Sequence, residues 1–142
     1  MSPELLFKIC NIFVLPGWLL LIFLPKWKWS AKFISAILIP FILASVYIYL
    51  ILAYFWGAKG GFASLDQVTT LFDSPHLLLA GWVHYLAFDL FVGCWELRDS
   101  QKLNISHFLL IPCLILTFLF GPAGLFLYLI LRYFISKKIT ID

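Results

Sequence analysis

Ionisable side chains lie inside an apolar stretch of the sequence between residues 73 and 99. This stretch, DSPHLLLAGWVHYLAFDLFVGCWELRD, carries His84 and Asp89 near its centre and Glu96 near its end. An aspartate at the centre of a membrane helix costs about 2.5–3.5 kcal/mol on insertion scales, so a functional role is expected for such groups. A histidine and a carboxyl group in an apolar pocket can donate and accept protons. The pair therefore indicates acid/base chemistry on a lipophilic substrate.

Helical spacing divides these polar side chains between two faces of one predicted helix. At about 100° per residue, His84 and Asp89 are about 140° apart, while His76 and His84 share a face. The face that carries Asp89 comprises Trp82, Tyr85, Asp89, Val92 and Glu96. A site that uses both faces therefore needs walls from neighbouring helices. In the structural alternative, His84 bonds a backbone carbonyl and Asp89 is paired with Asn11 or a tyrosine of another helix.

Neither metal nor haem binding is expected from these residues. His76, His84 and Asp89 are three possible metal ligands, but they lie on different faces and no HxxxH motif is present. Haem ligation by His84 with His107 is geometrically conceivable. His107 lies near the start of an apolar run, however, where an interfacial histidine is the ordinary expectation. We therefore predict that the protein has no cofactor.

The composition places the chain outside the soluble class. It is 63% hydrophobic and 12% charged, whereas soluble domains carry about 25% charged residues. We predict an all-α, polytopic membrane protein with a single domain over residues 1–142. The net charge is +3, and the basic residues lie at segment ends, which favours lipid head groups over nucleic acid as partners. With no CxxC motif, the cysteines are expected to be small buried hydrophobic residues: Cys10, Cys94 and Cys113.

Apolar runs of suitable length predict four membrane spans, at about 5–24, 33–55, 75–95 and 105–135. The third span has Ser74 as N-cap and Pro75 at its first position, and it contains no internal proline. A short amphipathic helix over about 64–72, with Ser64 and Gln67 in a capping box, is predicted to lie at the membrane interface.

The last apolar run allows two interpretations. At about 46 Å as a helix it is too long for one straight span and too short for two. It is either a kinked fourth span or a re-entrant hairpin that turns at Gly121-Pro122. Four spans divide the ten basic residues equally between the two sides, whereas a hairpin leaves two on one side and eight on the other. The positive-inside rule favours the hairpin, with the first loop and the C-terminus in the cytoplasm, although four spans are the simpler architecture.

No cleavable signal or transit peptide is evident, because the first apolar run has Glu4 before it, Lys8 near its start and no small-residue cleavage site after it. We therefore expect a multi-pass protein of a bacterial inner membrane or a thylakoid.

Three segments resemble the ABA4-like membrane proteins: PGWLLLIFLPKWKWS (16–30), GWVHYLAFDLFVGCWELRDS (81–100) and LTFLFGPAGLFLYLILR (116–132). The matching motif positions are Trp82, His84, Tyr85, Asp89 and Gly93. The resemblance implies four membrane segments and a role in carotenoid metabolism, since the plant member is required to make neoxanthin from violaxanthin. That isomerisation opens an epoxide and forms an allene, which needs a proton donor and a base and no redox cofactor. No catalytic residue follows from the resemblance, and a bacterial relative is expected to act on a different carotenoid or on double-bond geometry.

The leading hypothesis is a carotenoid isomerase that acts on a xanthophyll or another carotenoid. His84 and Asp89 are its predicted acid and base, in either order. The predicted substrate-binding residues are Trp82, Tyr85, His76, Asn11 and Glu96. In the alternative, the chain is a non-catalytic subunit that binds a pigment or packs against a larger membrane complex, and a homo-oligomer is also possible. A small transporter ranks last, because the sequence shows no internal repeat.

Overall fold

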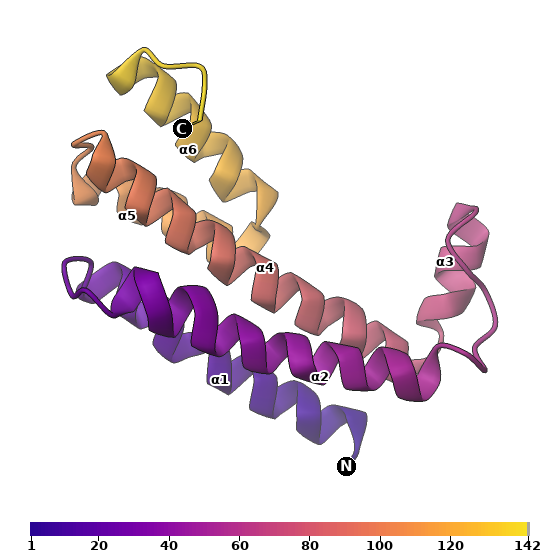
Figure 1. The fold of residues 1–142 in the computed structure, drawn as a ribbon. Helices are drawn as coiled ribbons and strands as arrows, with labels where there is room; N and C mark the ends of the chain where they lie inside the picture. Colours follow the sequence, from indigo (N-terminus) through magenta and orange to yellow (C-terminus); the bar gives the residue numbers. More distant parts are fainter. Residues whose placement is uncertain (142) are drawn as a thin grey trace.

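The computed structural model describes residues 1–141, which form helices and connecting loops and contain no β-strand. Figure 1 shows the helices lying roughly along one direction, with α3 projecting at one end. In chain order they are α1 (Pro3–Phe23), the π-helix η1 (Ser30–Leu38), α2 (Ile39–Tyr54), α3 (Leu65–Phe72), α4 (Pro75–Lys102), α5 (His107–Phe120) and α6 (Pro122–Ser136). The predicted all-α class is therefore confirmed.

Three helices in the described chain are long and apolar enough to cross a membrane. They are α1 with 21 residues, the continuous η1–α2 helix with 25 and α4 with 28. Each apolar side chain on their outer faces is exposed in the isolated chain, and a lipid environment would cover it. α4 lies at the centre of the bundle, because it contacts α1, η1, α2, α3, α5 and α6.

The second span begins as a π-helix and becomes an α-helix near Pro40. The amide of Ile34 donates to the Trp29 carbonyl and that of Ile39 to Ile34, each five residues back. Proline lacks an N–H and cannot join the α-helical ladder, and the change of hydrogen-bond register lies next to Pro40. In the π-helical part, the buried Ser35 hydroxyl donates to the Gly17 carbonyl of α1 at 3.0 Å. This bond joins the first two spans where the small Gly17 allows a close approach.

The amphipathic helix predicted over 64–72 corresponds to α3, whose N-cap is Ser64. The Ser64 hydroxyl accepts a hydrogen bond from the amide of Gln67 at 3.2 Å. Leu71 is buried at the start of α4, whereas Leu65 is exposed. α3 thus covers the N-terminal end of α4 with one face only.

α4 is two turns longer than the sequence prediction, which ended the span near Trp95. Ser74 occupies the N-cap position and Pro75 the first turn, although the Ser74 side chain makes no capping bond. The helix continues to Lys102 through a polar segment whose Glu96 and Asp99 are buried. This extension is stable because side chains of α5 and α6 supply partners for both carboxylates.

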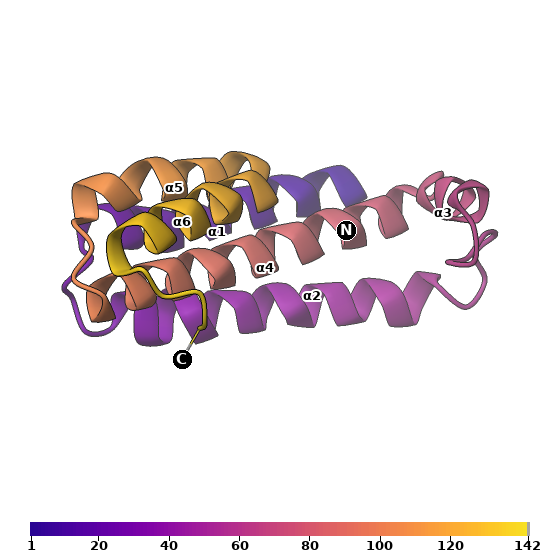
Figure 2. The same ribbon diagram turned by 90° about the horizontal axis from the view of Figure 1, so that it is seen from above.

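The last apolar run forms a hairpin of two short helices. α5 has 14 residues and α6 has 15, or about 21 and 22 Å, and neither spans a hydrocarbon core of about 30 Å. They turn at Gly121, whose φ of 44° is a conformation that favours glycine. Figure 2 shows that α6 returns toward the end of the bundle where α5 begins, so the hairpin lies along only part of α4. The structure therefore shows the turn at Gly121-Pro122 that the hairpin interpretation predicts.

Candidate functional site

A groove of about 570 Å³ lies between the beginning of α1 and the first half of α4, beyond the tip of the α5–α6 hairpin. Its lining is mostly apolar and includes Phe7 of α1, Phe72 of α3 and Leu78 of α4. Trp82 and Tyr85 lie at the end of the groove nearest the hairpin tip. Because the hairpin is short, α5 and α6 do not cover this part of α4. We call this space the α1–α4 groove.

Trp82 is held in the groove by Asn11. The Trp82 indole N–H donates to Asn11 Oδ1 at 3.1 Å, and the Asn11 amide nitrogen donates to the Phe7 carbonyl at 2.7 Å. The Trp82 ring also contacts Phe7 and Tyr85, with centroid separations of 5.6 and 5.3 Å. The structure thus brings together three predicted substrate-binding residues, Asn11, Trp82 and Tyr85. Asn11 positions the indole and does not pair with Asp89.

Tyr85 and Asp89 form a phenol–carboxyl pair at the hairpin tip. The Tyr85 hydroxyl donates to the Phe118 carbonyl of α5 at 3.3 Å and interacts with the Asp89 side chain one turn along α4. Asp89 Oδ2 is buried and has no hydrogen-bond partner among the described residues. An unpartnered carboxyl oxygen away from water is costly, and a proton on it would offset part of that cost.

Gly121 allows the hairpin tip to reach Asp89. A Cβ atom on Gly121 would lie 2.7 Å from Asp89 Oδ1 and 3.0 Å from Oδ2, closer than such atoms normally approach. The glycine is therefore required both by its positive φ and by its carboxyl neighbour. The Gly121-Pro122 break, which the sequence allowed as a kink or a turn, is a turn in the structure and lies against Asp89.

Glu96 lies deeper in the bundle and does not line the groove. It is fully buried, and its carboxyl oxygens accept from the Thr117 hydroxyl of α5 at 2.9 and 3.1 Å. Thr117 in turn packs directly on Gly124 of α6, where no side chain would fit. Glu96 is thus a predicted substrate-binding residue that the structure places in a helix–helix contact.

His84 and His76 lie on the opposite side of α4, facing α2. The His84 ring stacks on Phe88 and meets Tyr47 edge-on, while the His76 ring stacks on Tyr54 at a centroid separation of 3.8 Å. His84 lines a second hollow of about 320 Å³, which shares Phe72 and Gly81 with the α1–α4 groove. The structure therefore does not bring His84 and Asp89 into contact.

The possible metal and haem ligands are also separated. No group of three His, Cys, Asp or Glu residues in the described chain is arranged to hold a metal ion. His107 begins α5, and its Nε2 is hydrogen-bonded to the Ile22 carbonyl at 2.8 Å. Because a carbonyl only accepts, Nε2 carries the proton in this bond, and His107 joins α5 to α1.

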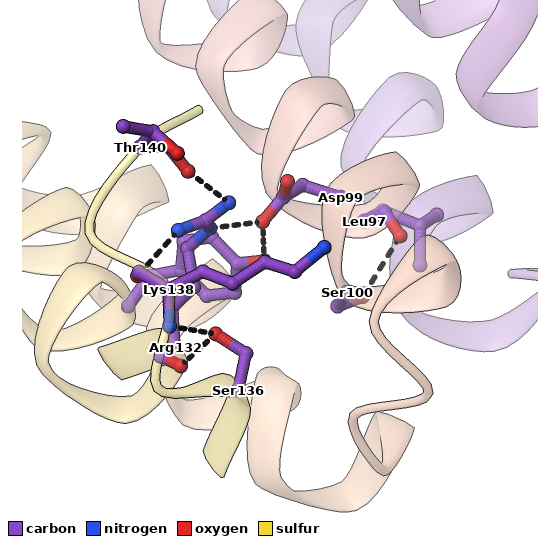
Figure 3. Close-up of polar contacts among 8 residues, drawn as sticks. Leu97, Asp99, Ser100, Arg132, Ser136, Lys138 and Thr140 are labelled. Atoms are coloured by element: carbon purple, nitrogen blue, oxygen red, sulfur yellow. Dashed lines mark hydrogen bonds and ion pairs between the residues drawn. The ribbon is translucent and has the colours of Figure 1, made fainter. Parts of the chain in front are cut away.

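A buried ion pair, which was not predicted from the sequence, joins α4 and α6. The Asp99 carboxylate accepts from Arg132 Nε at 2.8 Å and from the Tyr128 hydroxyl at 2.5 Å. Arg132 also donates to the carbonyls of Lys138 and Thr140, at 3.0 and 2.9 Å, which folds the C-terminal segment back over α6 (Figure 3). One signal was present in the sequence, because Arg132 interrupts an apolar run and buried charges need partners.

These features define a helical membrane protein that carries an apolar groove and a phenol–carboxyl pair in its interior. The chain belongs to the ABA4-like (ABA DEFICIENT 4-like) family, whose sequence model it matches over residues 5–128. It is similar to Protein ABA DEFICIENT 4, chloroplastic, of Arabidopsis thaliana, with 26% identity over 143 residues. The match covers 94% of this chain but only 60% of that curated relative. No solved structure matches the chain.

Proposed function

We propose that this protein is a multi-pass membrane isomerase of carotenoid metabolism, which binds a carotenoid or a similar polyene in the α1–α4 groove. Membership of the family and the similarity to a protein named for abscisic acid deficiency support a carotenoid-related role. The observation that carries the proposal is the position of Tyr85, which lines the apolar groove and is bonded to the hairpin, with Asp89 beside it one turn along α4.

The groove suits a ligand that enters from the bilayer. It is largely apolar, with aromatic side chains from α1, α3 and α4. If the end ring of a carotenoid packed against Phe7 and Trp82, the polar substituents of that ring would lie near Tyr85. Apolar sites with a few placed polar groups are the usual form of small-ligand sites. Asn11 would act by holding the Trp82 indole, and not by touching the ligand.

Acid/base isomerisation fits these residues, because the substrate and the product have the same atoms and the protein has only to donate and accept a proton. When an epoxide opens, its oxygen gains a proton as the C–O bond breaks. A polyene carbon then loses a proton as a new double bond forms, so the product is an isomer and no electrons are transferred. In the proposed reaction, Tyr85 presents its hydroxyl to the substrate and Asp89 exchanges the proton with it. This chemistry requires no redox cofactor.

His84 has a different proposed role from the one that its sequence position indicated. It lies in the second hollow on the α2 side, beyond Phe72 and Gly81. Phe72 packs on Gly81 between the two spaces, so an elongated ligand in contact with both Tyr85 and His84 would have to displace the Phe72 ring. We therefore assign His84 to the remote part of the ligand and proton transfer to Tyr85 and Asp89, whereas His76 is stacked on Tyr54 and lines neither space.

The proposed orientation in the membrane follows from the hairpin. α5 begins and α6 ends at the same side of the bundle. Eight of the ten basic residues therefore lie at that side. The positive-inside rule then places the loop between α1 and η1 and the C-terminal segment in the cytoplasm or its organellar equivalent. A bacterial inner membrane and a thylakoid both fit this orientation.

Expression in carotenoid-producing cells, followed by chromatography of the pigments, tests the proposed function. We expect the wild-type chain to convert a resident carotenoid to an isomer of equal mass. Asp89→Asn and Tyr85→Phe should each reduce conversion by about 100-fold or more, the usual range for loss of an acid or base. Asp66→Asn, which changes an exposed carboxylate on α3, is the matched control and should retain conversion.

Two outcomes would contradict the proposal in different ways. If wild type, Asp89→Asn and Asp66→Asn give identical pigment profiles, the protein is not an isomerase of those carotenoids. If the purified wild-type protein then carries an unaltered carotenoid in its absorption spectrum, a pigment-binding subunit is the better description. Loss of conversion in His84→Ala alone would return the acid/base role to His84.

A further inference from the structure

A polar hollow lies at the end of the bundle opposite α3, far from the α1–α4 groove. It has a volume of about 530 Å³ and is bordered by the loop after α1, the first turns of η1, the last turns of α4 and the start of α5. Four basic side chains line it: Lys26, Lys28, Lys32 and Arg98. No carboxylate is among the described residues that line it. We call this space the basic hollow.

The positive charges of the basic hollow are not neutralised within the described chain. The ion pairs of the described residues join Lys8 to Glu4 and Arg132 to Asp99, and none of these four residues lines the hollow. Lys28 has one aromatic contact, with its Nζ 5.3 Å from the centre of the Trp29 ring. Like charges that surround a concave space repel one another, and a bound anion would relieve that repulsion.

Hydrogen bonds between elements hold the walls of the hollow in place. Gln101 of α4 donates from Nε2 to the Pro25 carbonyl at 2.7 Å, and His107 of α5 is bonded to the Ile22 carbonyl. These two bonds fix both α4 and α5 to the end of α1. The side chains of Gln101 and Asn104 also line the hollow and can donate to an anion. The space is therefore formed before any ligand binds.

The position of the hollow indicates a lipid as the source of the anion. It lies where the apolar helix α1 ends, next to the exposed side chains of Phe23, Leu24 and Trp27. Tryptophan beside lysine at the end of a span is typical of the head-group level of a bilayer. A phosphate that enters the hollow at this level can keep its acyl chains against the apolar surface of α1.

We propose that the basic hollow binds the phosphate of an anionic phospholipid such as phosphatidylglycerol. The excess of basic residues at this end supports the proposal, because basic pockets on the cytoplasmic side of helical bundles are suited to anionic head groups. Lys26, Lys28, Lys32 and Arg98 supply charge, while Gln101 and Asn104 supply uncharged donors. The site is separate from the reaction proposed for the α1–α4 groove, and either proposal can fail without the other.

Lipid titration of the purified full-length protein tests this site. The protein is held in an uncharged detergent, and its thermal unfolding is followed as phosphatidylglycerol or phosphatidylcholine is added. We expect phosphatidylglycerol to raise the unfolding temperature at lower concentration than phosphatidylcholine. The variant Lys32→Gln/Arg98→Gln should weaken the apparent affinity for phosphatidylglycerol by about 30-fold, since each basic residue contributes about 5-fold. Added salt should weaken wild-type binding in the same direction.

The matched control removes two charges at the same end of the bundle but outside the hollow. Lys102→Gln/Lys137→Gln changes two exposed lysines and should retain wild-type affinity. Equal weakening in both double variants would overturn the proposal, because it would indicate general charge attraction. Equal effects of the two lipids on wild type would also overturn it. If inorganic phosphate alone stabilises wild type as strongly as phosphatidylglycerol, the hollow is a site for free phosphate and the lipid assignment is wrong.

Discussion

The buried ion pair between Asp99 and Arg132 gives the sharpest stability prediction. Asp99→Ala removes the carboxylate that accepts from Arg132 at 2.8 Å and from the Tyr128 hydroxyl at 2.5 Å. Arg132 is 3% exposed and Tyr128 fully buried, so water cannot replace the lost partner. Removing one partner of a buried ion pair lowers the free energy of unfolding by about 3–5 kcal/mol. Because Arg132 keeps its bonds to the carbonyls of Lys138 and Thr140, we expect about 3 kcal/mol, the lower end.

Unfolding of the purified protein by SDS in mixed micelles, followed by tryptophan fluorescence, measures this loss. Trp95 packs edge-on against Tyr128 and lies close enough to report on the separation of α6 from α4. Asp66→Ala, on the exposed surface of α3, should change the free energy of unfolding by less than about 0.5 kcal/mol.

A double variant tests whether the two charges act as a pair. Asp99→Leu/Arg132→Met replaces both by apolar side chains, and should lose less stability than the sum of its single variants, with a coupling of about 2 kcal/mol. Additive losses, or a loss below about 1 kcal/mol in Asp99→Ala, would show that this ion pair does not hold the hairpin to α4.

Two further predictions concern the hairpin, and the same unfolding measurement checks both. Thr117→Val removes the hydroxyl that donates to the buried Glu96 and should cost about 1–3 kcal/mol, whereas Thr117→Ser keeps the donor and should cost less; equal losses would mean that packing, not the hydrogen bond, matters. Gly121→Ala would place a Cβ atom on a residue with a φ of 44° and against the Asp89 carboxyl, so we expect the free energy of unfolding to fall by about 1–3 kcal/mol. Gly57 has open space around it, so Gly57→Ala should be nearly neutral. A neutral Gly121→Ala would show that the turn can move away from Asp89.

Much of the fold could be predicted because it depends on local signals. The Ser74-Pro75 start of α4, the length of the apolar runs and the Gly121-Pro122 break are all visible in the sequence. The two faces of α4 also follow from helical spacing, and the structure places Tyr85 and Asp89 on one and His84 on the other. Periodicity alone therefore separated the candidate acid/base residues correctly.

The remaining features depend on contacts between residues far apart in the sequence. Whether 105–135 crosses once or turns back is decided partly by Asp99 and Arg132, which are 33 positions apart. The end of α4 was misplaced for the same reason, since Glu96 and Asp99 are polar enough to suggest a loop until α5 and α6 cover them. The basic hollow likewise joins two segments that are far apart in the sequence, 25–32 and 97–107, so its lysines could be recognised only as interfacial residues.

The half-length hairpin also has a consequence for how the chain is inserted during synthesis. In the proposed orientation, everything after Lys102 enters and leaves the bilayer from the side on which the ribosome works. Arg132, Lys137 and Lys138 are therefore never carried across the hydrocarbon core, which spares the cost of translocating three cations. The connection between α2 and α4 is then the only polar loop among the described residues that has to be exported. The last third of the chain can thus fold against α4 after the three long helices are already in place.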